Sequence, residues 1–278
     1  MVSDTVTLRS GHVMPAIGLG TWPLTDGDAE AAVLVGIACG YRQIDTAARY
    51  GNEEAVGRGI LHSGVDRAEL FVTTKLRGSD HGDVRPALER SLAALGLDYV
   101  DLYLIHWPLP RLNLYPRAFE LMAQLAGEGL IRSIGVSNFR VEHIEHLISE
   151  TGLVPAVDQI ELDPTIQRRA LRDTLRAHGI VPQAWSPLGR GGPLLQNPVI
   201  VDAAASAGCT VGQLILRWHR AHGIVPVVKS ADPARQRENL AAIHLPPLQP
   251  ELVAALDALD ADDAGEQRIR DSNTHEEF

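Results

Sequence analysis

The chain has 278 residues and carries 35 Asp and Glu against 25 Lys and Arg, a formal net charge of −10. An acidic surface repels nucleic acid and anionic membranes, so we expect neither as a partner. The sequence contains no apolar run of about 18 residues and no signal-peptide pattern, so we expect neither a membrane span nor a leader. Cys39 and Cys209 lie far apart and fit neither a disulfide framework nor a metal-ligand spacing, which favours a reducing, cytoplasmic setting.

Short apolar runs alternate with longer amphipathic segments along the chain. A hairpin is predicted first, with strands at 6–8 and 13–16. Strand-like runs follow at 16–19, 42–45, 71–75, 100–106, 133–137, 156–161, 181–185 and 225–229. Helices are predicted at 27–39, 52–63, 81–95, 116–127, 140–150, 168–178, 210–221 and 232–241, and two more at 197–207 and 249–259 have no strand of their own. Asn52, Thr210 and Asp232 are the predicted N-caps of three of these helices.

Eight strand–helix units indicate either a doubly wound sheet or a closed barrel. The doubly wound dinucleotide fold carries G-x-G-x-x-G after its first strand, but here Gly18 and Gly20 lead into Thr21-Trp22-Pro23 without a third glycine. The early hairpin also suits the bottom of a barrel. We therefore predict an α/β fold, a (β/α)8 TIM barrel with an N-terminal β-hairpin and two extra helices, as one domain over residues 1–278.

Polar residues stand at the C-terminal ends of the predicted strands, where a buried strand would not choose them. In a barrel these ends meet at one rim, which is the face that carries the chemistry of such enzymes. One such residue alone is as easily a hydrogen-bonded structural group, but seven strands that share the pattern predict a site. The residues are Asp45, Lys75, His106, Ser137 with Asn138, Gln159, Trp185 with Ser186, and Lys229 with Ser230.

Four residues of this rim suit carbonyl reduction. Tyr50 follows Asp45 closely, and a tyrosine whose pKa is near 10 is a poor acid at neutral pH unless a cation lies beside it. Lys75 can supply that cation, and Asp45 can hold it. His106 adds a donor for a carbonyl oxygen, so the set fits a hydride transfer to carbon with protonation of oxygen by Tyr50.

The chain also resembles the aldo-keto reductase family in several long segments. These are GYRQIDTAARYGNEEAVG (40–57), VDLYLIHWP (100–108), IGVSN (134–138), QAWSPLG (183–189) and VVKSADPARQREN (227–239). The WSPLG form is most similar to bacterial 2,5-diketo-D-gluconate reductase-like members. The resemblance implies a reductase of aldehydes and ketones, including dicarbonyls such as 2,5-diketo-D-gluconate or methylglyoxal, with NADPH/NADP+ as cofactor.

The resemblance also assigns roles to individual residues. The catalytic tetrad would be Asp45, Tyr50, Lys75 and His106, with Tyr50 as general acid. Residues expected to contact the nicotinamide half of the cofactor are Thr21, Asp45, Ser137, Asn138, Gln159 and Trp185. Those expected at the pyrophosphate are Ser186, Pro187, Leu188 and Gly189, and those at the adenosine end are Lys229, Ser230, Arg235, Glu238 and Asn239. Apart from the resemblance, Trp22 and Trp107 lie just past strand ends at the rim, where aromatic residues more often line a pocket than serve ordinary packing, so we expect them to line the substrate pocket with Tyr50 and His106. In the family the C-terminal segment folds over the barrel mouth, so Phe278 is expected to join Trp22 there.

The preference for NADPH has a physical basis as well. Lys229 ends a predicted strand and Arg235 lies in the first turn of the helix capped by Asp232, so two cations meet a helix N-terminus that suits a dianionic 2′-phosphate. Three positions depart from the family pattern: Val228 replaces a proline, Asp158 an asparagine, and Asp163 the histidine of His-Pro.

Other interpretations stay open at this point. Lys75 alone would suit a Schiff-base aldolase, although that leaves Tyr50 and His106 unexplained. His143 and His146 have helical spacing that suggests a metal site, but their acidic helix favours a solvated outer face, and we expect no metal. The same fold also serves as a cofactor-sensing regulatory subunit. We expect a small carbonyl compound as the only partner, and a monomer.

Overall fold

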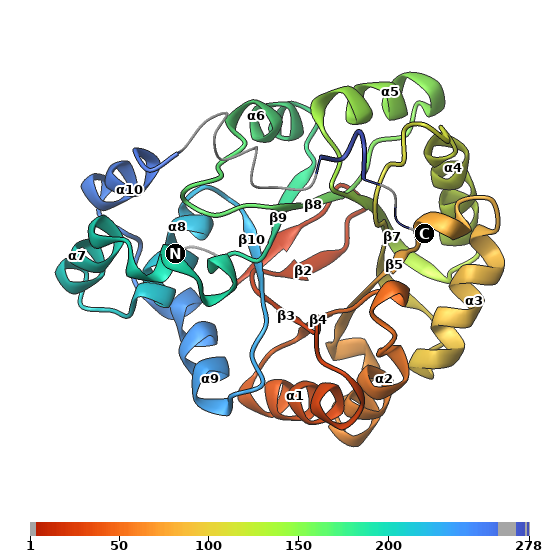
Figure 1. The fold of residues 1–278 in the computed structure, drawn as a ribbon. Coiled ribbons are helices and arrows are strands. Elements are labelled where there is room, and N and C mark those ends of the chain that lie inside the picture. The colour runs from red at the N-terminus through yellow and green to blue at the C-terminus, as the bar shows by residue number, and fades with distance from the viewer. Residues whose placement is uncertain (1–3, 261–270, 276, 278) are drawn as a thin grey trace.

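The structure is a computed structural model that describes residues 4–260, 271–275 and 277. Eight parallel strands close into a barrel in the order β10-β3-β4-β5-β6-β7-β8-β9, with helices around it (Figure 1). The strands are β3 (Gly18–Gly20), β4 (Gln43–Asp45), β5 (Phe71–Leu76), β6 (Val100–Ile105), β7 (Ile131–Ser137), β8 (Val157–Glu161), β9 (Val181–Trp185) and β10 (Val225–Val228). The predicted TIM barrel is confirmed.

The helices also follow the prediction closely. Those that alternate with the strands are α1 (Asp26–Cys39), α2 (Glu53–His62), α3 (Val84–Leu95), α4 (Tyr115–Gly127), α5 (Val141–Thr151), α6 (Arg169–Ala177), α8 (Val211–Ala221) and α9 (Pro233–Ala241). The two predicted extra helices are α7 (Pro198–Ser206) and α10 (Pro250–Asp257). Short 3-10 turns add η1 (Ala48–Tyr50), η2 (Arg67–Glu69), η3 (Gly78–Asp80), η4 (Gly189–Gly191), η5 (Pro193–Gln196) and η6 (Ala242–His244).

In the described part of the chain no single helix is long and apolar enough to cross a membrane. The helices α7 and α8, bent at 87° to each other, meet the criterion of length and composition only as a pair.

The N-terminal hairpin closes the end of the barrel at which the strands begin. Its strands are β1 (Thr5–Thr7) and β2 (Val13–Pro15). Leu8 and Met14 of the hairpin are buried in one apolar cluster with Phe71 and Val225, the first residues of β5 and β10. The hairpin therefore covers the bottom of the barrel and leaves the opposite rim for the site.

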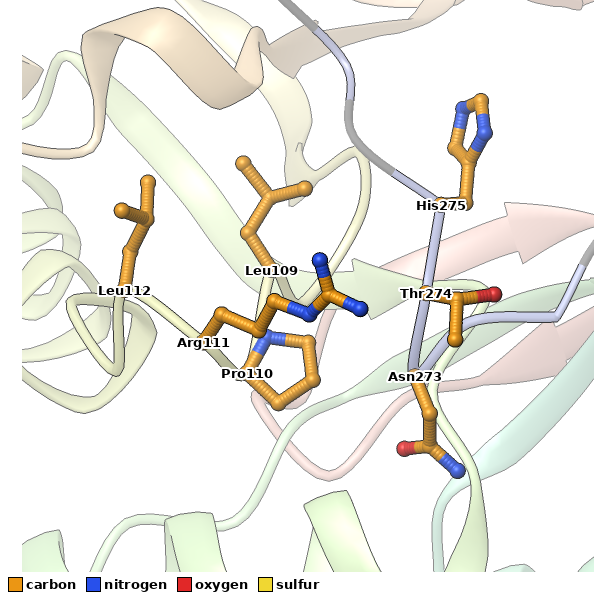
Figure 2. Close-up of a pocket in the computed structure, with 7 residues that line it drawn as sticks. All are labelled: Leu109, Pro110, Arg111, Leu112, Asn273, Thr274 and His275. Atoms are coloured by element: carbon orange, nitrogen blue, oxygen red, sulfur yellow. The ribbon is translucent and has the colours of Figure 1, made fainter.

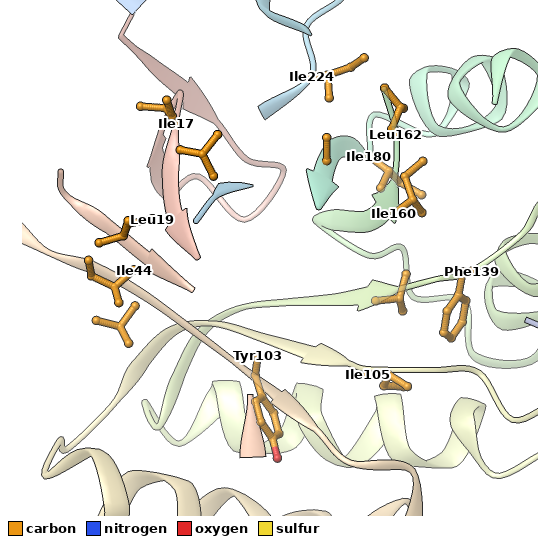
Figure 3. Packing of buried hydrophobic residues seen from close by; sticks show 14 of the residues in the cluster. Ile17, Leu19, Ile44, Tyr103, Ile105, Phe139, Ile160, Leu162, Ile180 and Ile224 are labelled. Atoms are coloured by element: carbon orange, nitrogen blue, oxygen red, sulfur yellow. The ribbon is translucent and has the colours of Figure 1, made fainter. Parts of the chain in front are cut away.

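The main core lies between the barrel and its helices. Successive side chains of a strand point to opposite faces, so Ile44 and Ile160 point outward while Asp45 and Gln159 point into the barrel. Figure 3 shows this outer layer, in which residues such as Phe139 pack between strands and helices. The outer face of the sheet is thus mostly apolar, and polar groups lie inside the barrel near the C-terminal ends of the strands.

Two of the three predicted N-caps are confirmed. Asp232 accepts hydrogen bonds from the backbone amides of Ala234 and Arg235, and Thr210 forms a reciprocal capping box with Gln213. Asn52 also stands at the predicted N-cap position, of α2, but its side chain makes no capping hydrogen bond.

Asn52 instead joins two loops that follow the C-terminal ends of β3 and β4. Its amide nitrogen donates to the carbonyl oxygen of Leu24 at 2.8 Å, and its side-chain oxygen accepts from the Thr46 hydroxyl at 2.8 Å. The loop that carries Tyr50 is thereby held against the loop that follows β3.

Candidate active site

A buried ion pair occupies the rim of the barrel. Lys75 Nζ donates to Asp45 Oδ1 at 2.6 Å and to the carbonyl oxygen of Thr46 at 2.8 Å. The side chain of Lys75 is 0% exposed and that of Asp45 is 5% exposed. A lysine in such a place is stable only with a close partner, so Asp45 keeps the ammonium group inside the barrel.

Tyr50 and His106 complete the predicted group of four. The 3-10 turn η1 directs the Tyr50 hydroxyl toward Lys75, whose Nζ donates to it at 3.4 Å. His106 follows β6 directly, and its ring meets the ring of Tyr50 edge-on at a centroid distance of 5.8 Å. All four residues therefore lie together at one end of the barrel.

Burial affects both Tyr50 and Lys75. It raises the pKa of Tyr50, and the charge of Lys75 offsets this only in part, so the expected acidification by Lys75 is outweighed. For Lys75, burial acts to lower the pKa, but the charge of Asp45, with the hydrogen bonds to Asp45 and Tyr50, raises it overall. At neutral pH the pair is thus a neutral phenol beside an ammonium ion.

Asn138 links His106 to Trp185. Its amide nitrogen donates to the carbonyl oxygen of His106 at 2.9 Å, and its side-chain oxygen accepts from Trp185 Nε1 at 2.9 Å. Asn138 has a φ of 62°, a left-handed conformation that asparagine tolerates better than most residues. The backbone that carries His106 and the indole of Trp185 are therefore fixed by one side chain.

A column of side-chain amides extends from Asp45 down the barrel. Gln159 Nε2 donates to Asp45 Oδ2 at 2.6 Å and to Gln183 Oε1 at 2.7 Å, and Gln183 Nε2 lies 3.8 Å from the sulfur of Met14. The Ser137 hydroxyl donates to the carbonyl oxygen of Gln159 at 2.7 Å. Sequence reasoning missed Gln183, although its place two residues before Trp185 on the same inward face was a usable signal.

Thr21 lies at the same level as Asp45. Its hydroxyl donates to the carbonyl oxygen of Asp45 at 3.0 Å, and its side chain is buried. This places Thr21 on the loop after β3, between the ion pair and Asn52.

The segment predicted to cover the pyrophosphate forms a tight turn after β9. Ser186 has a φ of 52°, and its carbonyl oxygen accepts from the backbone amide of Gly189 at 2.9 Å, so Pro187 and Leu188 form the turn between them. Arg190 follows, and its guanidinium group lies 5.5 Å from the ring centre of Trp185. The turn thus lies next to the indole that is predicted to stack on the cofactor ring.

The residues predicted at the adenosine end gather at the N-terminus of α9. Lys229 and Arg235 are exposed there, whereas Ser230 is buried and accepts a hydrogen bond from the backbone amide of Asp232 at 3.0 Å. Asn239 is buried on the same helix. Two exposed cations at the start of a helix are a donor set that fits a phosphate group.

Glu238 is placed differently from the other residues of this group. Its carboxylate accepts from the hydroxyl of Thr210 at 2.7 Å, which joins α9 to the start of α8. Glu238 therefore has a hydrogen-bond partner within the protein itself.

The two predicted pocket tryptophans differ in their surroundings. Trp22 is 50% exposed, and Arg190 lies 5.6 Å from its ring centre. Trp107 is 6% exposed, and its ring lies 4.1 Å from that of His275. Trp22 is thus open to a ligand and Trp107 is covered by the C-terminal segment. The expected partner of Trp22, Phe278, lies outside the described residues.

The C-terminal segment also forms one wall of a small pocket beside the rim. Figure 2 shows Leu109, Pro110, Arg111 and Leu112 on one side and Asn273, Thr274 and His275 on the other. The first group belongs to the loop between β6 and α4. The tail and this loop therefore shape the same side of the site.

The solvated outer face predicted for α5 does not include His143. This side chain is 3% exposed and contacts the tail through Asn273. The acidic composition of the helix suggests an exposed face, and the sequence does not show that Asn273, 130 residues away, contacts His143. Within residues 4–260, 271–275 and 277, no group of three His, Cys, Asp or Glu side chains is arranged to hold a metal ion.

Comparison with known proteins gives consistent matches. The model of the Aldo/keto reductase family matches residues 16–261. An aldo-keto reductase of Mycobacterium sp. (strain KMS) is 47% identical over 241 residues, with 86% of this chain and 87% of the relative covered. Methylglyoxal reductase DkgA of Escherichia coli (strain K12) is 46% identical over 241 residues, with 86% and 88% covered.

Solved structures match as well. An aldo/keto reductase from Brucella melitensis is 43% identical, with a TM-score of 0.89 over 94% of this chain and 100% of that one. A mutant of Gox0644, crystallised in complex with NADPH, is 35% identical, with a TM-score of 0.92 over 100% of both chains.

Proposed function

The chain belongs to the aldo/keto reductase family, and we propose that it uses NADPH to reduce small dicarbonyl compounds of the methylglyoxal or 2,5-diketo-D-gluconate kind. The observation that carries the proposal is the gathering of Asp45, Tyr50, Lys75 and His106 at one rim, with the lysine buried against the aspartate. The similarity to methylglyoxal reductase DkgA supports the substrate class.

The roles of the four residues follow from their chemistry. NADPH, when bound, supplies the hydride that reduces the carbonyl carbon. Tyr50 is a neutral phenol and gives its proton to the carbonyl oxygen, while the adjacent Lys75 ammonium stabilises the phenolate that remains. Asp45 holds Lys75 in its charged form, and His106 donates to the same oxygen and orients it.

Three features support binding of NADPH. Trp185 is fixed by Asn138 beside the turn at 186–189, so its ring is available to stack on a nicotinamide. Lys229 and Arg235 suit the 2′-phosphate that distinguishes NADPH from NADH. The solved structure of Gox0644 with NADPH is that of a protein with the same fold in complex with this cofactor.

Replacement of Tyr50 by phenylalanine tests the acid. Tyr50→Phe is expected to lower kcat by about 10²–10⁴-fold, because the proton donor is lost, while NADPH affinity changes little. Tyr99→Phe is the matched control, since Tyr99 packs between Arg67 and Arg132 away from the rim. Ordinary turnover by Tyr50→Phe would show that another group donates the proton.

A substrate panel tests the rest of the proposal. Methylglyoxal, 2,5-diketo-D-gluconate, phenylglyoxal and aromatic aldehydes are each assayed with NADPH and with NADH. The proposal expects the highest kcat/KM for a dicarbonyl compound with NADPH. A preference for simple aromatic aldehydes, or for NADH, contradicts it.

The regulatory-subunit alternative has a weaker basis. A cofactor sensor needs the nicotinamide site but has no use for a buried Lys75–Asp45 pair next to a phenol. A stoichiometric partner in a pull-down, combined with negligible turnover across the panel, would favour that alternative.

A further inference from the structure

The last described residues of the chain return to the catalytic rim. Asp271 forms an ion pair with Arg140 at 3.0 Å, and the side-chain oxygen of Asn273 lies 2.8 Å from Nε2 of His143 on α5. Ser272 between them is buried. The tail is therefore anchored on α5 before it reaches the site.

Glu277 extends from this tail to His106. Its Oε1 lies 2.6 Å from His106 Nδ1, and its Oε2 accepts from the backbone amide of Gly78 at 3.1 Å. The Glu277 side chain is 4% exposed. A Cβ on residue 78 would lie 2.6 Å from the carbonyl oxygen of Glu277, so the glycine permits the close approach. A buried carboxylate is thus fixed behind the imidazole of the proposed active site.

This contact determines which nitrogen of His106 carries a proton. The contact joins a ring nitrogen to a carboxylate oxygen, and it is an ion pair when the ring is charged. At 2.6 Å a bare Nδ1 lone pair would repel the carboxylate oxygen, so Nδ1 must be protonated. Nε2 then remains for the substrate, and it can donate a hydrogen bond only if the ring carries a second proton.

The charges around Glu277 keep it ionised. Burial acts to raise its pKa, but the contact with His106, the Gly78 amide and the charge of Arg49 lower it overall. Among the described residues, His81 and Tyr50 also interact with the charge of Glu277. Burial lowers the pKa of His81 to about 4, so this ring is neutral at neutral pH, and burial, more than Glu277, raises the pKa of Tyr50.

We propose that Glu277 is a positioning residue for His106. Its carboxylate holds the proton on Nδ1, so that His106 presents Nε2–H to the carbonyl oxygen as a doubly protonated, positively charged ring. The proposal rests on the proposed reductase function and adds a residue of the tail to it. A charged donor stabilises the developing negative charge on oxygen more strongly than a neutral one.

Glu277→Gln tests the role through the pH profile. Glu277→Gln removes the negative charge that lies 2.6 Å from the ring, so the basic limb of kcat/KM is expected to move down by about one to two pH units. At neutral pH, kcat/KM falls roughly tenfold, a part of the ~10²–10³ that a whole oxyanion donor contributes. Glu277→Asp keeps the charge and is expected to restore much of the profile.

Asp271→Asn is the matched control, because it removes a tail carboxylate that pairs with Arg140 and not with His106. It is expected to leave the basic limb where it is in the wild type. An equal shift in Asp271→Asn and Glu277→Gln would mean that loosening of the tail explains the effect, and the proposal would be overturned.

Histidine ¹⁵N NMR gives a readout that needs no turnover. The ring signals of His106 are assigned by their loss in His106→Gln, and their titration is compared in wild type and Glu277→Gln. A doubly protonated ring at neutral pH in the wild type that becomes neutral in Glu277→Gln supports the proposal. Identical titrations overturn it, whereas absent turnover across the carbonyl panel overturns the proposed function instead.

Discussion

Asp158 is a buried carboxyl group whose ionised form destabilises the fold. It lies on β8 between Val157 and Gln159, so it shares the outward face with Ile160, and it is 0% exposed. Neither carboxyl oxygen has a well-aligned hydrogen bond within the described residues. Burial raises its pKa well above the ordinary value, and the Phe139 amide and the charge of Arg168 offset this only in part.

The pH dependence of stability follows from this shift. Between the unfolded pKa near 3.9 and the higher folded pKa, the folded chain binds a proton that the unfolded chain does not. Stability is therefore lost as pH rises through this window, by about 1.4 kcal/mol per pH unit. By pH 7 the largest possible loss is about 4 kcal/mol, which corresponds to a carboxyl group that stays neutral when folded.

Asp158→Asn removes this titration and keeps the shape of the side chain. Because the new amide is left with a buried N–H group, part of the gain is lost. We expect the variant to be about 2 kcal/mol more stable than the wild type at pH 7 and about 2 kcal/mol less stable near pH 4, where the wild-type carboxyl group is neutral as well.

Urea unfolding from pH 4 to pH 8 measures the effect. Asp98→Asn is the control, because Asp98 is exposed and its replacement should change stability little at any pH. If the free energies of unfolding of the wild type and Asp158→Asn differ by the same amount at every pH in this range, Asp158 is ionised in the folded protein and the reasoning is refuted.

Three further variants test the site. Lys75→Met leaves Asp45 buried without its cation, so urea unfolding should show a loss of about 3–5 kcal/mol together with lost turnover, and unchanged stability would contradict the ion-pair argument. Arg235→Ala should weaken NADPH binding about tenfold in calorimetric titration and leave NADH unaffected, whereas equal losses would place the 2′-phosphate elsewhere. Trp185→Ala should weaken both cofactors alike, since it removes a stacking surface and the bond to Asn138, and unchanged affinities would exclude stacking.

Much of the barrel could be predicted because the signals are local. Period-two and helical patterns located all eight strands, and the shared position of Asp45, Lys75 and His106 at strand ends identified the rim. Asp232 and Thr210 were readable as caps for the same reason, since a cap binds amides of its own first turn.

The errors concern side chains with partners far along the chain. Asparagine is a common N-cap residue, but the side chain of Asn52 forms hydrogen bonds with Leu24 and Thr46 instead of with the amides of its own helix. Glu277 could not be paired with His106 from sequence, because nothing in an acidic tail shows where its end will lie. The pKa of Tyr50 was misjudged because the sequence shows the neighbouring charge but not the depth of burial.

The amide column has a consequence for the whole enzyme. Side-chain hydrogen bonds through Gln159 and Gln183 link the carboxylate of Asp45 to the thioether of Met14, so the rim of the barrel is supported from its floor. Removal of the N-terminal hairpin would delete none of the four proposed catalytic residues, yet it would remove the lower end of the column of side chains that holds Asp45.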